Sequence, residues 1–388
     1  NSDAVNELKH IKQNMGGALQ GGPLHYIATV IDWQSRQPTL ILGRKNRNAL
    51  FREDNVLSRV FRRKYLENLP FSGKLGDSIV FFQMLFHLLK FRPNKILCSP
   101  SGGPLWAAFI VARIYSARLV HTRHSRVEAL KGSLSRRLAT NITNWIIRQA
   151  DVIICHGPYL EKQLLEIGVD PTRLYQFNLS YDYLLDKKIT KLITHQYFPN
   201  NYLLFVGRME KNKGIFDLFH ALKEKLTNQP SLQLVYAGDG PDLETLRELI
   251  KENALDTQVK IFGFIEHNKL PELIRRSLCV VLPTRMALPE SRCKAAIESL
   301  VLGKPVIAPN TGPFPYVVDN QMNGLLFQPD SMKDLQQQLV RMLDDKQLFN
   351  HLASGAQNSY KKLAYSSFNF RNALDAAFNL AEEKFTST

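Results

Sequence analysis

Short runs of β-branched and aliphatic residues alternate with helix-length segments from about residue 95 onward. In the first half of the chain these runs are Lys95–Cys98, Arg118–Thr122, Asp151–Cys155 and Leu174–Phe177. Such alternation is typical of βαβ units, in which crossover helices join parallel strands. The pattern therefore predicts an α/β fold for this half.

The alternation restarts after a polar, irregular stretch around residues 182–200. The strands expected beyond it are Tyr202–Val206, Leu232–Ala237, Val259–Phe262, Leu278–Leu282, Pro305–Ala308 and Leu325–Phe327. A chain of 388 residues is too long for one compact core. We therefore expect two doubly wound, Rossmann-like domains, at residues 1–185 and 196–365. Residues 366–388 are expected to form a helix that packs back towards the first domain.

The N-terminal residues 1–15 are polar, whereas a Rossmann-like domain usually opens with an apolar strand. We therefore expect a truncated or gapped N-terminus from which the first strand is missing. The pair Gly21-Gly22 precedes a helical pattern over residues 23–33. Backbone N–H groups at a helix start can approach a phosphate, although a flexible loop explains the glycines equally well.

The charge of the chain is concentrated in its first half. The sequence has 50 Lys+Arg and 35 Asp+Glu, a net charge of +15. Residues 1–195 hold 28 basic and 14 acidic side chains (+14), and residues 196–388 hold 22 and 21 (+1). Such an excess indicates an anionic partner: nucleic acid, an acidic membrane surface or a phosphorylated substrate. The two halves are therefore expected to meet different partners.

Cysteine usage and hydropathy indicate the compartment. The four cysteines lie far apart without a CxxC pair, which predicts a reducing cytosol and no structural zinc. The longest apolar stretch, Ile79–Phe91, contains Gln83, His87 and Lys90 and is too short and polar to cross a bilayer. The first residues do not resemble a signal peptide, so we expect none. We expect a cytoplasmic protein whose membrane contact is peripheral.

A basic loop follows one of the expected strands of the second half. The strand ends at Gly207-Arg208, and Lys213-Gly214 opens a helix a few residues later. Open α/β sheets bind ligands at the carboxyl ends of their strands, where an arginine and a lysine can neutralise a diphosphate. A solvated basic loop is the alternative, but an arginine directly after the strand-end glycine favours a phosphate site.

Two carboxylates, Glu290 and Glu298, stand eight positions apart around an expected helix start. At about 100° per residue, both would lie near one helical face. Carboxylates so placed can accept hydrogen bonds from sugar hydroxyls, although paired glutamates usually only solvate a helix. The strand at Pro305–Ala308, which follows Gly303, favours a binding site.

Several ordered motifs together resemble glycosyltransferase family 4. They are Gly207-Arg208, Lys213-Gly214, AGDGPDLETL from Ala237 to Leu246, and Glu290-x7-Glu298 followed by Gly303-Lys-Pro305-Val-Ile. In the first half, His121–Gly132 looks like the family's loop after a core strand. Ala150–Asp170 is similar to the strand and helix that precede the interdomain linker. The resemblance implies a GT-B fold, with two domains facing across a cleft, and a retaining enzyme that uses a nucleotide sugar.

The resemblance also implies how the donor diphosphate is held. Arg208 and Lys213 would bind it, with Gly21 and Gly22 facing it from the opposite domain. No DxD sequence lies in a plausible site, so we expect no metal and no cofactor, the two cations taking the metal's place. Retention without an obvious protein nucleophile fits front-side attack by the acceptor hydroxyl. That path develops oxocarbenium character and requires preorganised charge around the leaving diphosphate.

The remaining site residues implied by the resemblance concern the sugar and the ribose. Glu298 would bind the ribose, and Glu290 would contact sugar hydroxyls and stabilise the developing positive charge. Backbone amides around Cys293 and Lys294 would meet the sugar or the phosphate. His124 would lie beside the transferred sugar, so Glu290 and His124 are the catalytic candidates.

The chain departs from the family pattern at two places. Ser291-Arg292-Cys293 stands where the family usually has Gly-Phe-Gly, and Thr311–Pro315 replaces a family glutamate. Bulkier, charged residues can alter the donor pocket, so the identity of the donor sugar stays open.

Two basic amphipathic segments are expected to form helices in the first half. One is Val56–Leu66, with Arg59, Arg62 and Arg63 on one stripe. The second combines Lys131, Arg136, Arg137 and Arg148 with Leu134, Leu138, Trp145 and Ile146. Such helices can lie on anionic lipid, or they can pack an apolar stripe on the core beneath a solvated basic face. Family members that build on lipid-linked acceptors favour the membrane.

These observations predict a metal-independent hexosyltransferase at the membrane surface. It would move a hexose or N-acetylhexosamine from a nucleotide diphosphate sugar, with UDP expected first, to a lipid-linked, lipopolysaccharide or other cell-surface glycan. A nucleotide-sugar epimerase or hydrolase on the same scaffold is one alternative. A basic nucleic-acid-binding protein is another. The absence of an aromatic-and-basic RNA motif from the sequence argues against nucleic acid as a partner.

Overall fold

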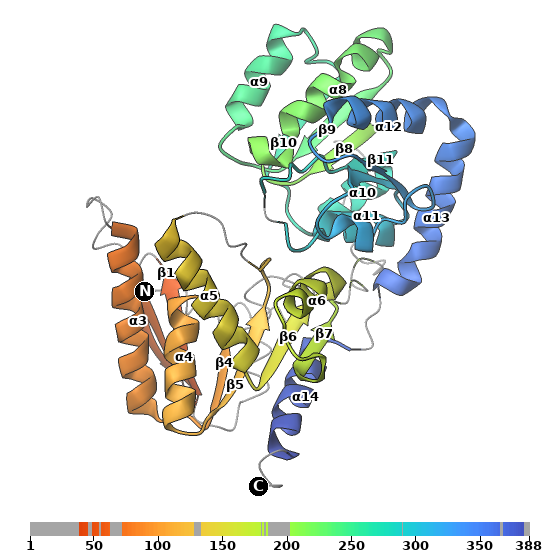
Figure 1. Ribbon diagram of the computed structural model, residues 1–388. Coiled ribbons are helices and arrows are strands. Elements are labelled where there is room, and N and C mark those ends of the chain that lie inside the picture. The colour runs from red at the N-terminus through yellow and green to blue at the C-terminus, as the bar shows by residue number, and fades with distance from the viewer. Residues whose placement is uncertain are drawn as a thin grey trace. The chain divides into compact units, whose positions relative to one another are not determined.

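The computed structural model describes residues 39–45, 49–53, 56–62, 72–127, 133–179, 181, 184, 202–288, 290–364 and 368–383. The chain divides into two units, which are described separately below (Figure 1). Unit 1 comprises the chain up to Leu179 together with the segment from Ser367 onward, and unit 2 comprises Ser180–Ser366.

Unit 1 contains a four-stranded parallel sheet with the order β4-β5-β6-β7. Its strands are β4 (Lys95–Cys98), β5 (Arg118–Arg123), β6 (Val152–His156) and β7 (Leu174–Phe177). The helices between them are α4 (Gly103–Ile114), α5 (Leu134–Gln149) and α6 (Gly157–Glu166). Each strand lies within one residue of its predicted position. Because β6 is buried along its whole length, it reads as a continuous apolar run, as parallel strands covered on both faces do.

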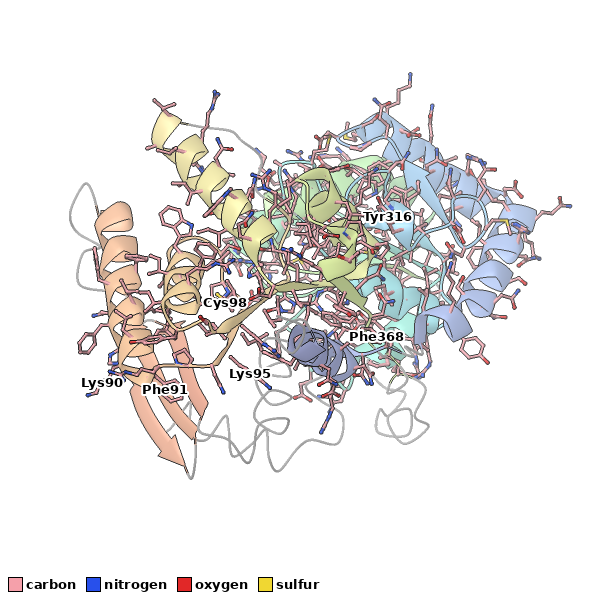
Figure 2. All side chains as sticks on the ribbon, turned by 60° about the horizontal axis from the view of Figure 1, so that its bottom comes forward. Lys90, Phe91, Lys95, Cys98, Tyr316 and Phe368 are labelled. Carbon is pink, nitrogen blue, oxygen red and sulfur yellow. The ribbon has the colours of Figure 1, made fainter. Side chains whose placement is uncertain are left out.

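Helices flank this sheet. Helix α3 (Ser72–Phe91) packs against α4, and α4 packs against α5, so the three form one layer (Figure 1). Helix α14 (Phe370–Glu383) contacts β5, β6 and β7. Its Phe370 ring lies 5.1 Å from that of Phe177, and Arg118 donates a hydrogen bond to the carbonyl oxygen of Phe378 (3.2 Å). The Nζ atom of Lys95, labelled in Figure 2, lies 5.6 Å from the centroid of the Phe378 ring.

A three-stranded sheet with the order β1-β3-β2 precedes α3. Strand β3 (Val56–Arg62) runs parallel to β1 (Thr39–Lys45) and antiparallel to β2 (Ala49–Glu53). The prediction of a helix over Val56–Leu66 is therefore wrong, and β1 and β2 were missed. The apolar residues of this segment fit a helical period, but its β-branched and aromatic residues favour extended backbone, and β3 pairs on both edges. Residues 1–38, with the expected N-terminal gap, lie outside the described residues.

Unit 2 is built on a six-stranded, all-parallel sheet with the order β10-β9-β8-β11-β12-β13. Its strands are β8 (Tyr202–Val206), β9 (Gln233–Ala237), β10 (Val259–Gly263), β11 (Cys279–Val281), β12 (Val306–Pro309) and β13 (Gly324–Phe327). Counted from β8, this is the order 3-2-1-4-5-6 of doubly wound folds. The order reverses between β8 and β11, and ligands bind at such a switch point.

The helices of unit 2 cover both faces of this sheet. They are α8 (Ile215–Asn228), α9 (Leu243–Glu252), α10 (Leu270–Arg276), α11 (Lys294–Val301), α12 (Met332–Asp344) and α13 (Lys346–Ala364). Alternate residues of each strand face opposite layers. Leu203 and Phe205 join the core beneath α8, α9 and α12, whereas Tyr202 and Leu204 join the core beneath α10 and α11.

A buried histidine in the sheet of unit 1 makes the stability of this unit depend on pH. His121 in β5 is fully buried, and its Nδ1–H donates a hydrogen bond to the carbonyl oxygen of Cys98 (2.9 Å). Burial and then the charge of Arg123 lower the pKa of His121 to about 3, against an ordinary value of 6.5. The unfolded chain therefore takes up a proton at a higher pH than the folded one, and stability is lost as the pH falls from about 6.5 towards 3.

We expect His121→Asn to flatten this dependence, because the Asn amide can keep the bond to Cys98 without titrating. Between pH 7 and pH 4.5, the Tm of the unchanged protein should fall by roughly 5 °C more than that of the variant. Thermal unfolding followed by circular dichroism at both pH values measures the difference. Equal slopes for the two proteins would show that His121 does not carry the effect.

Candidate functional site

The carboxyl ends of β8 and β11 meet at the switch point of the unit 2 sheet. The loop from Gly207 to Gly214 follows β8 and contains a 3₁₀ turn, η4 (Lys211–Lys213). It carries both predicted diphosphate ligands, Arg208 and Lys213. The loop after β11 leads through Glu290 to the start of α11. The switch point therefore brings the two predicted motifs to one edge of the sheet.

These two loops touch through their backbones. Gly214 has a φ of 75°, and a Cβ atom there would overlap the carbonyl oxygen of Pro283. The Arg285 backbone N–H donates a hydrogen bond to the carbonyl oxygen of Asn212 (2.9 Å). The Arg285 side chain donates two hydrogen bonds to the carboxylate of Asp217 (2.7 and 2.6 Å), which raise the pKa of Arg285. The bidentate pair ties the loop after β11 to α8.

A third loop, after β9, holds the other side of the Arg208 loop. A Cβ atom at Gly238 would overlap the carbonyl oxygen of Gly207, and one at Gly240 would overlap the carbonyl oxygen of Met209. The Asp242 backbone N–H donates a hydrogen bond to the same Met209 oxygen (3.0 Å). This close approach gives the AGDGPDLETL motif a physical reason, since only glycine leaves room for the second backbone.

The structure brings Lys213 and Glu290 into direct contact. The Lys213 ammonium forms an ion pair with the Glu290 carboxylate, and about four-fifths of each side chain is shielded from solvent. Arg208 lies on the same loop and keeps 66% of its side chain exposed, with its Nε 3.5 Å from the Glu210 carboxylate. The loop thus offers one cation held against a carboxylate and a second that faces solvent.

Glu298 is a buried carboxylate with two nitrogen neighbours. It lies on α11 at 3% exposure, with Lys294 Nζ at 3.4 Å and His267 Nε2 at 4.0 Å. Burial and then the charge of Lys294 lower the pKa of His267 to about 4, so its imidazole is neutral at pH 7. A buried carboxylate requires a partner, and Lys294 supplies the charge.

The predicted common helical face for the two glutamates is wrong. Helix α11 begins at Lys294, with Cys293 as its N-cap, so Glu290 lies in the loop ahead of the helix. The two carboxylates instead pair with different lysines, Lys213 and Lys294. The Cys293 side chain is buried, and burial, followed by the charge of Glu290, raises the pKa of its thiol.

His124 lies in unit 1, directly after β5. Its ring centroid is 6.2 Å from that of Phe370 on α14. The preceding residue, Arg123, is buried and donates hydrogen bonds to the carbonyl oxygens of Ser125 (2.8 Å) and Arg126 (2.6 Å). Arg123 therefore fixes the backbone that directly follows His124.

Gly21 and Gly22 lie outside the part of the chain that the structure describes. Within the described ranges, no cluster of three or more His, Cys, Asp or Glu side chains is arranged to hold a metal ion. In that same part, no helix has both the length and the apolar character to cross a bilayer. Cys98, Cys155, Cys279 and Cys293 are buried and form no disulfide.

Two supporting residues were missed by the sequence analysis. Arg285 follows the end of β11, as Arg208 follows the end of β8. A basic residue after a strand end could therefore have identified Arg285 from the sequence. His267 belongs to no sequence pattern, because its place beside Glu298 depends on packing between loops far apart in the chain.

Two family models match the chain, one to each half. The model of glycosyl transferases group 1 matches residues 194–361, and that of Glycosyltransferase Family 4 matches residues 26–177. The chain belongs to glycosyltransferase family 4. The matched regions contain the residues predicted for the donor in unit 2 and His124 in unit 1.

Similar proteins include other glycosyltransferases. Alpha-D-kanosaminyltransferase of Streptomyces kanamyceticus is 29% identical over 154 residues, which are 40% of this chain and only 39% of that relative. A glycosyltransferase of Methanocaldococcus jannaschii is 23% identical over 345 residues, 83% of each chain. The crystal structure of Anabaena HepE with UDP has a TM-score of 0.64 at 18% identity, and covers 91% of this chain and 100% of that chain. The predicted GT-B fold class is confirmed.

We expect Gly214→Ala to destabilise unit 2 strongly, because the new Cβ must displace the Pro283 carbonyl group. Gly263→Ala is the matched control, since Gly263 also has a positive φ (67°) but has no atom within 4 Å of a Cβ. The control should cost about 1 kcal/mol for the left-handed backbone alone, and Gly214→Ala at least about 3 kcal/mol. Urea unfolding of both variants measures this. Equal losses would show that the contact with Pro283 does not constrain the loop.

Proposed function

We propose that this family 4 glycosyltransferase is a retaining hexosyltransferase. It transfers a hexose or N-acetylhexosamine from a UDP-sugar to a lipid-linked, lipopolysaccharide or other cell-surface glycan. The observation that carries the proposal is the Lys213–Glu290 ion pair at the switch point of unit 2, with Arg208 on the same loop. A UDP-sugar donor is supported by HepE, whose crystal structures contain UDP, UDP with glucose, and UDP-glucose.

The reaction places opposite charges on the two parts of the donor. The acceptor hydroxyl oxygen bonds to the anomeric carbon while the bond from that carbon to the diphosphate oxygen breaks. The electron pair leaves with the diphosphate, which accepts the hydroxyl proton, and both events take place on one face of the sugar. Arg208 and Lys213 stabilise the leaving diphosphate, and Glu290 stabilises the positive charge at the anomeric carbon.

The ion pair prepares Lys213 and Glu290 for this charge separation. When a donor binds, Lys213 exchanges the carboxylate for diphosphate oxygens, and Glu290 turns its charge to the sugar hydroxyls. The side chains are already ordered by their mutual contact, so less conformational entropy is lost on binding.

The remaining assignments concern the ribose and the sugar. Glu298 binds the ribose hydroxyls, and Lys294 pairs with its buried carboxylate. Backbone amides at Cys293 and Lys294 contact the sugar or the phosphate. His124 is the residue of unit 1 that we assign to the transferred sugar. Gly21 and Gly22 stay predicted phosphate contacts.

We also propose partners and a compartment. The acceptor, a glycan or a lipid-linked glycan, is reached by peripheral contact with an anionic membrane surface on the cytoplasmic side. The +14 charge of residues 1–195 supports this partner, and no nucleic acid is expected as a ligand.

Removing either cation should slow transfer. We expect Arg208→Ala and Lys213→Ala each to lower kcat/KM by roughly 100-fold, because each removes charge stabilisation of the leaving diphosphate. Glu290→Gln should lower kcat more than it raises KM. Arg247→Ala, an exposed arginine on α9 that pairs only loosely with Glu244 (3.8 Å), is the control and should leave transfer unchanged. Radiolabelled UDP-sugars with acceptor extracts provide the assay.

Two outcomes would contradict this proposal. Full transfer by all three site variants would refute the site assignment. Turnover of UDP-sugar at the same rate with and without acceptor would instead identify a hydrolase or an epimerase.

Transfer should not depend on a divalent metal, because two cationic side chains occupy the place beside the diphosphate. We expect EDTA in large excess over trace metal to leave the initial rate within about twofold. A loss of activity that Mg²⁺ or Mn²⁺ restores would refute the metal-independent mechanism.

A further inference from the structure

Helix α5 of unit 1 carries an apolar stripe on its solvent side. Leu134, Leu138 and Trp145 are 84%, 60% and 48% exposed. Leu138 and Trp145 follow Leu134 at about 40° and 20° of rotation around the helix, so the three lie on one face. The opposite face is packed against the core through the buried Ile146 and Ile147. The exposed stripe is therefore additional to the stripe that anchors the helix.

Contacts between α4 and α5 hold the exposed stripe in place. The Trp145 ring packs edge-to-face on Phe109 of α4, with the centroids 5.3 Å apart. Trp106 of α4 donates a hydrogen bond from its indole N–H to the hydroxyl of Thr143 on α5 (3.0 Å). Helices α3 and α4 belong to the same layer as α5 (Figure 1). They carry further exposed apolar side chains: Phe82, Phe86, Ile110 and Ile114.

A groove of about 500 Å³ lies beside the stripe. It is lined by Asn141, Ile142, Asn144, Trp145, Arg148 and Ile167. One part of this lining is apolar, and the other offers N–H donors from two amides and a guanidinium. A phosphate group with hydrocarbon attached matches both parts, because the guanidinium binds phosphate oxygens and the apolar part contacts carbon.

The charge of this surface selects an anionic partner. Helix α5 carries Arg136, Arg137 and Arg148, and neither α4 nor α5 contains an aspartate or a glutamate. Arg137 and Arg148 lie at about 300° and 320° around the helix from Leu134, so they border one side of the apolar stripe. An exposed apolar stripe that contains a tryptophan and is bordered by arginines is typical of helices that lie in the interface of anionic bilayers.

We propose that the α5 face docks on anionic phospholipid, with Leu134, Leu138 and Trp145 entering the interface and one lipid phosphate seated in the groove at Arg148. This inference deepens the proposed function and rests on it, since it names the surface by which the enzyme reaches a lipid-linked acceptor. Two parts of the sequence-based prediction of membrane-binding helices are wrong. Val56–Arg62 is a strand, and Ile146 is buried in the core.

Vesicle co-sedimentation tests this surface. We expect the full chain to bind vesicles of phosphatidylglycerol and phosphatidylcholine, and to bind pure phosphatidylcholine at least about tenfold more weakly. Leu134→Ser with Leu138→Ser should lower binding to the anionic vesicles by at least about tenfold. Arg148→Gln should lower it about fivefold, the loss expected for one interfacial cation. Both leucines are largely exposed, so their replacement leaves the core intact.

The matched controls lie in unit 2. Phe264→Ser with Met332→Ser removes two side chains that are 79% and 51% exposed, and Arg341→Gln removes an exposed arginine on α12. Neither control should change vesicle binding. Equal binding to neutral and anionic vesicles, or unchanged binding by the stripe variant, would overturn the proposal. A dimer that dissociates in the stripe variant, seen by light scattering, would overturn it in favour of a second copy of this chain.

The test separates this inference from the proposed function. Vesicle binding involves no sugar transfer, and the donor residues lie in unit 2. A protein that transfers sugar to a soluble acceptor but binds no anionic vesicle refutes the docking surface alone. One that binds vesicles through α5 but transfers no sugar refutes the enzymatic proposal alone.

Discussion

The site of unit 2 depends on three loops whose backbones touch. Gly214, Gly238 and Gly240 each stand where a Cβ atom would overlap a carbonyl oxygen of a neighbouring loop. Because the contacts are between main chains, they hold the loop that carries Arg208 and Lys213 without help from any ligand. The cations are thus positioned by the parallel sheet, whose strand order brings the loop ends together.

The charged side chains of the site are arranged as ion pairs. Lys213 faces Glu290, and Lys294 faces Glu298, so each predicted carboxylate already has a cation. The first pair is partly exposed, so that a ligand can reach the lysine. In the second pair the Glu298 carboxylate is buried and lies 3.4 Å from Lys294 Nζ, so its position is fixed. The Lys213–Glu290 pair can therefore exchange partners more readily than the Lys294–Glu298 pair.

The strands were predictable where burial on both faces makes the sequence uniformly apolar, as in β6 and β8. Val56–Arg62 was not, because a short apolar run fits a helical and an extended period equally well. Within the site, Arg208 and Lys213 could be predicted because they stand next to glycines at a strand end and at a helix start. The contact of Lys294 with Glu298 is local, but His267 joins them through tertiary packing, which no spacing rule encodes. The prediction that Glu290 shares a helical face with Glu298 was wrong because the helix begins four residues after Glu290.

The place of α14 has a consequence for the order in which the protein folds. Unit 2 is one continuous segment, whereas unit 1 is completed by residues that follow unit 2 in the chain. During synthesis, the side of Phe177 that packs against Phe370 stays exposed until Phe370 has left the ribosome. Unit 2 can reach its native state before the last helix of unit 1 has been made. The nascent chain therefore presents the β4–β7 sheet without α14 for the time needed to make the whole of unit 2.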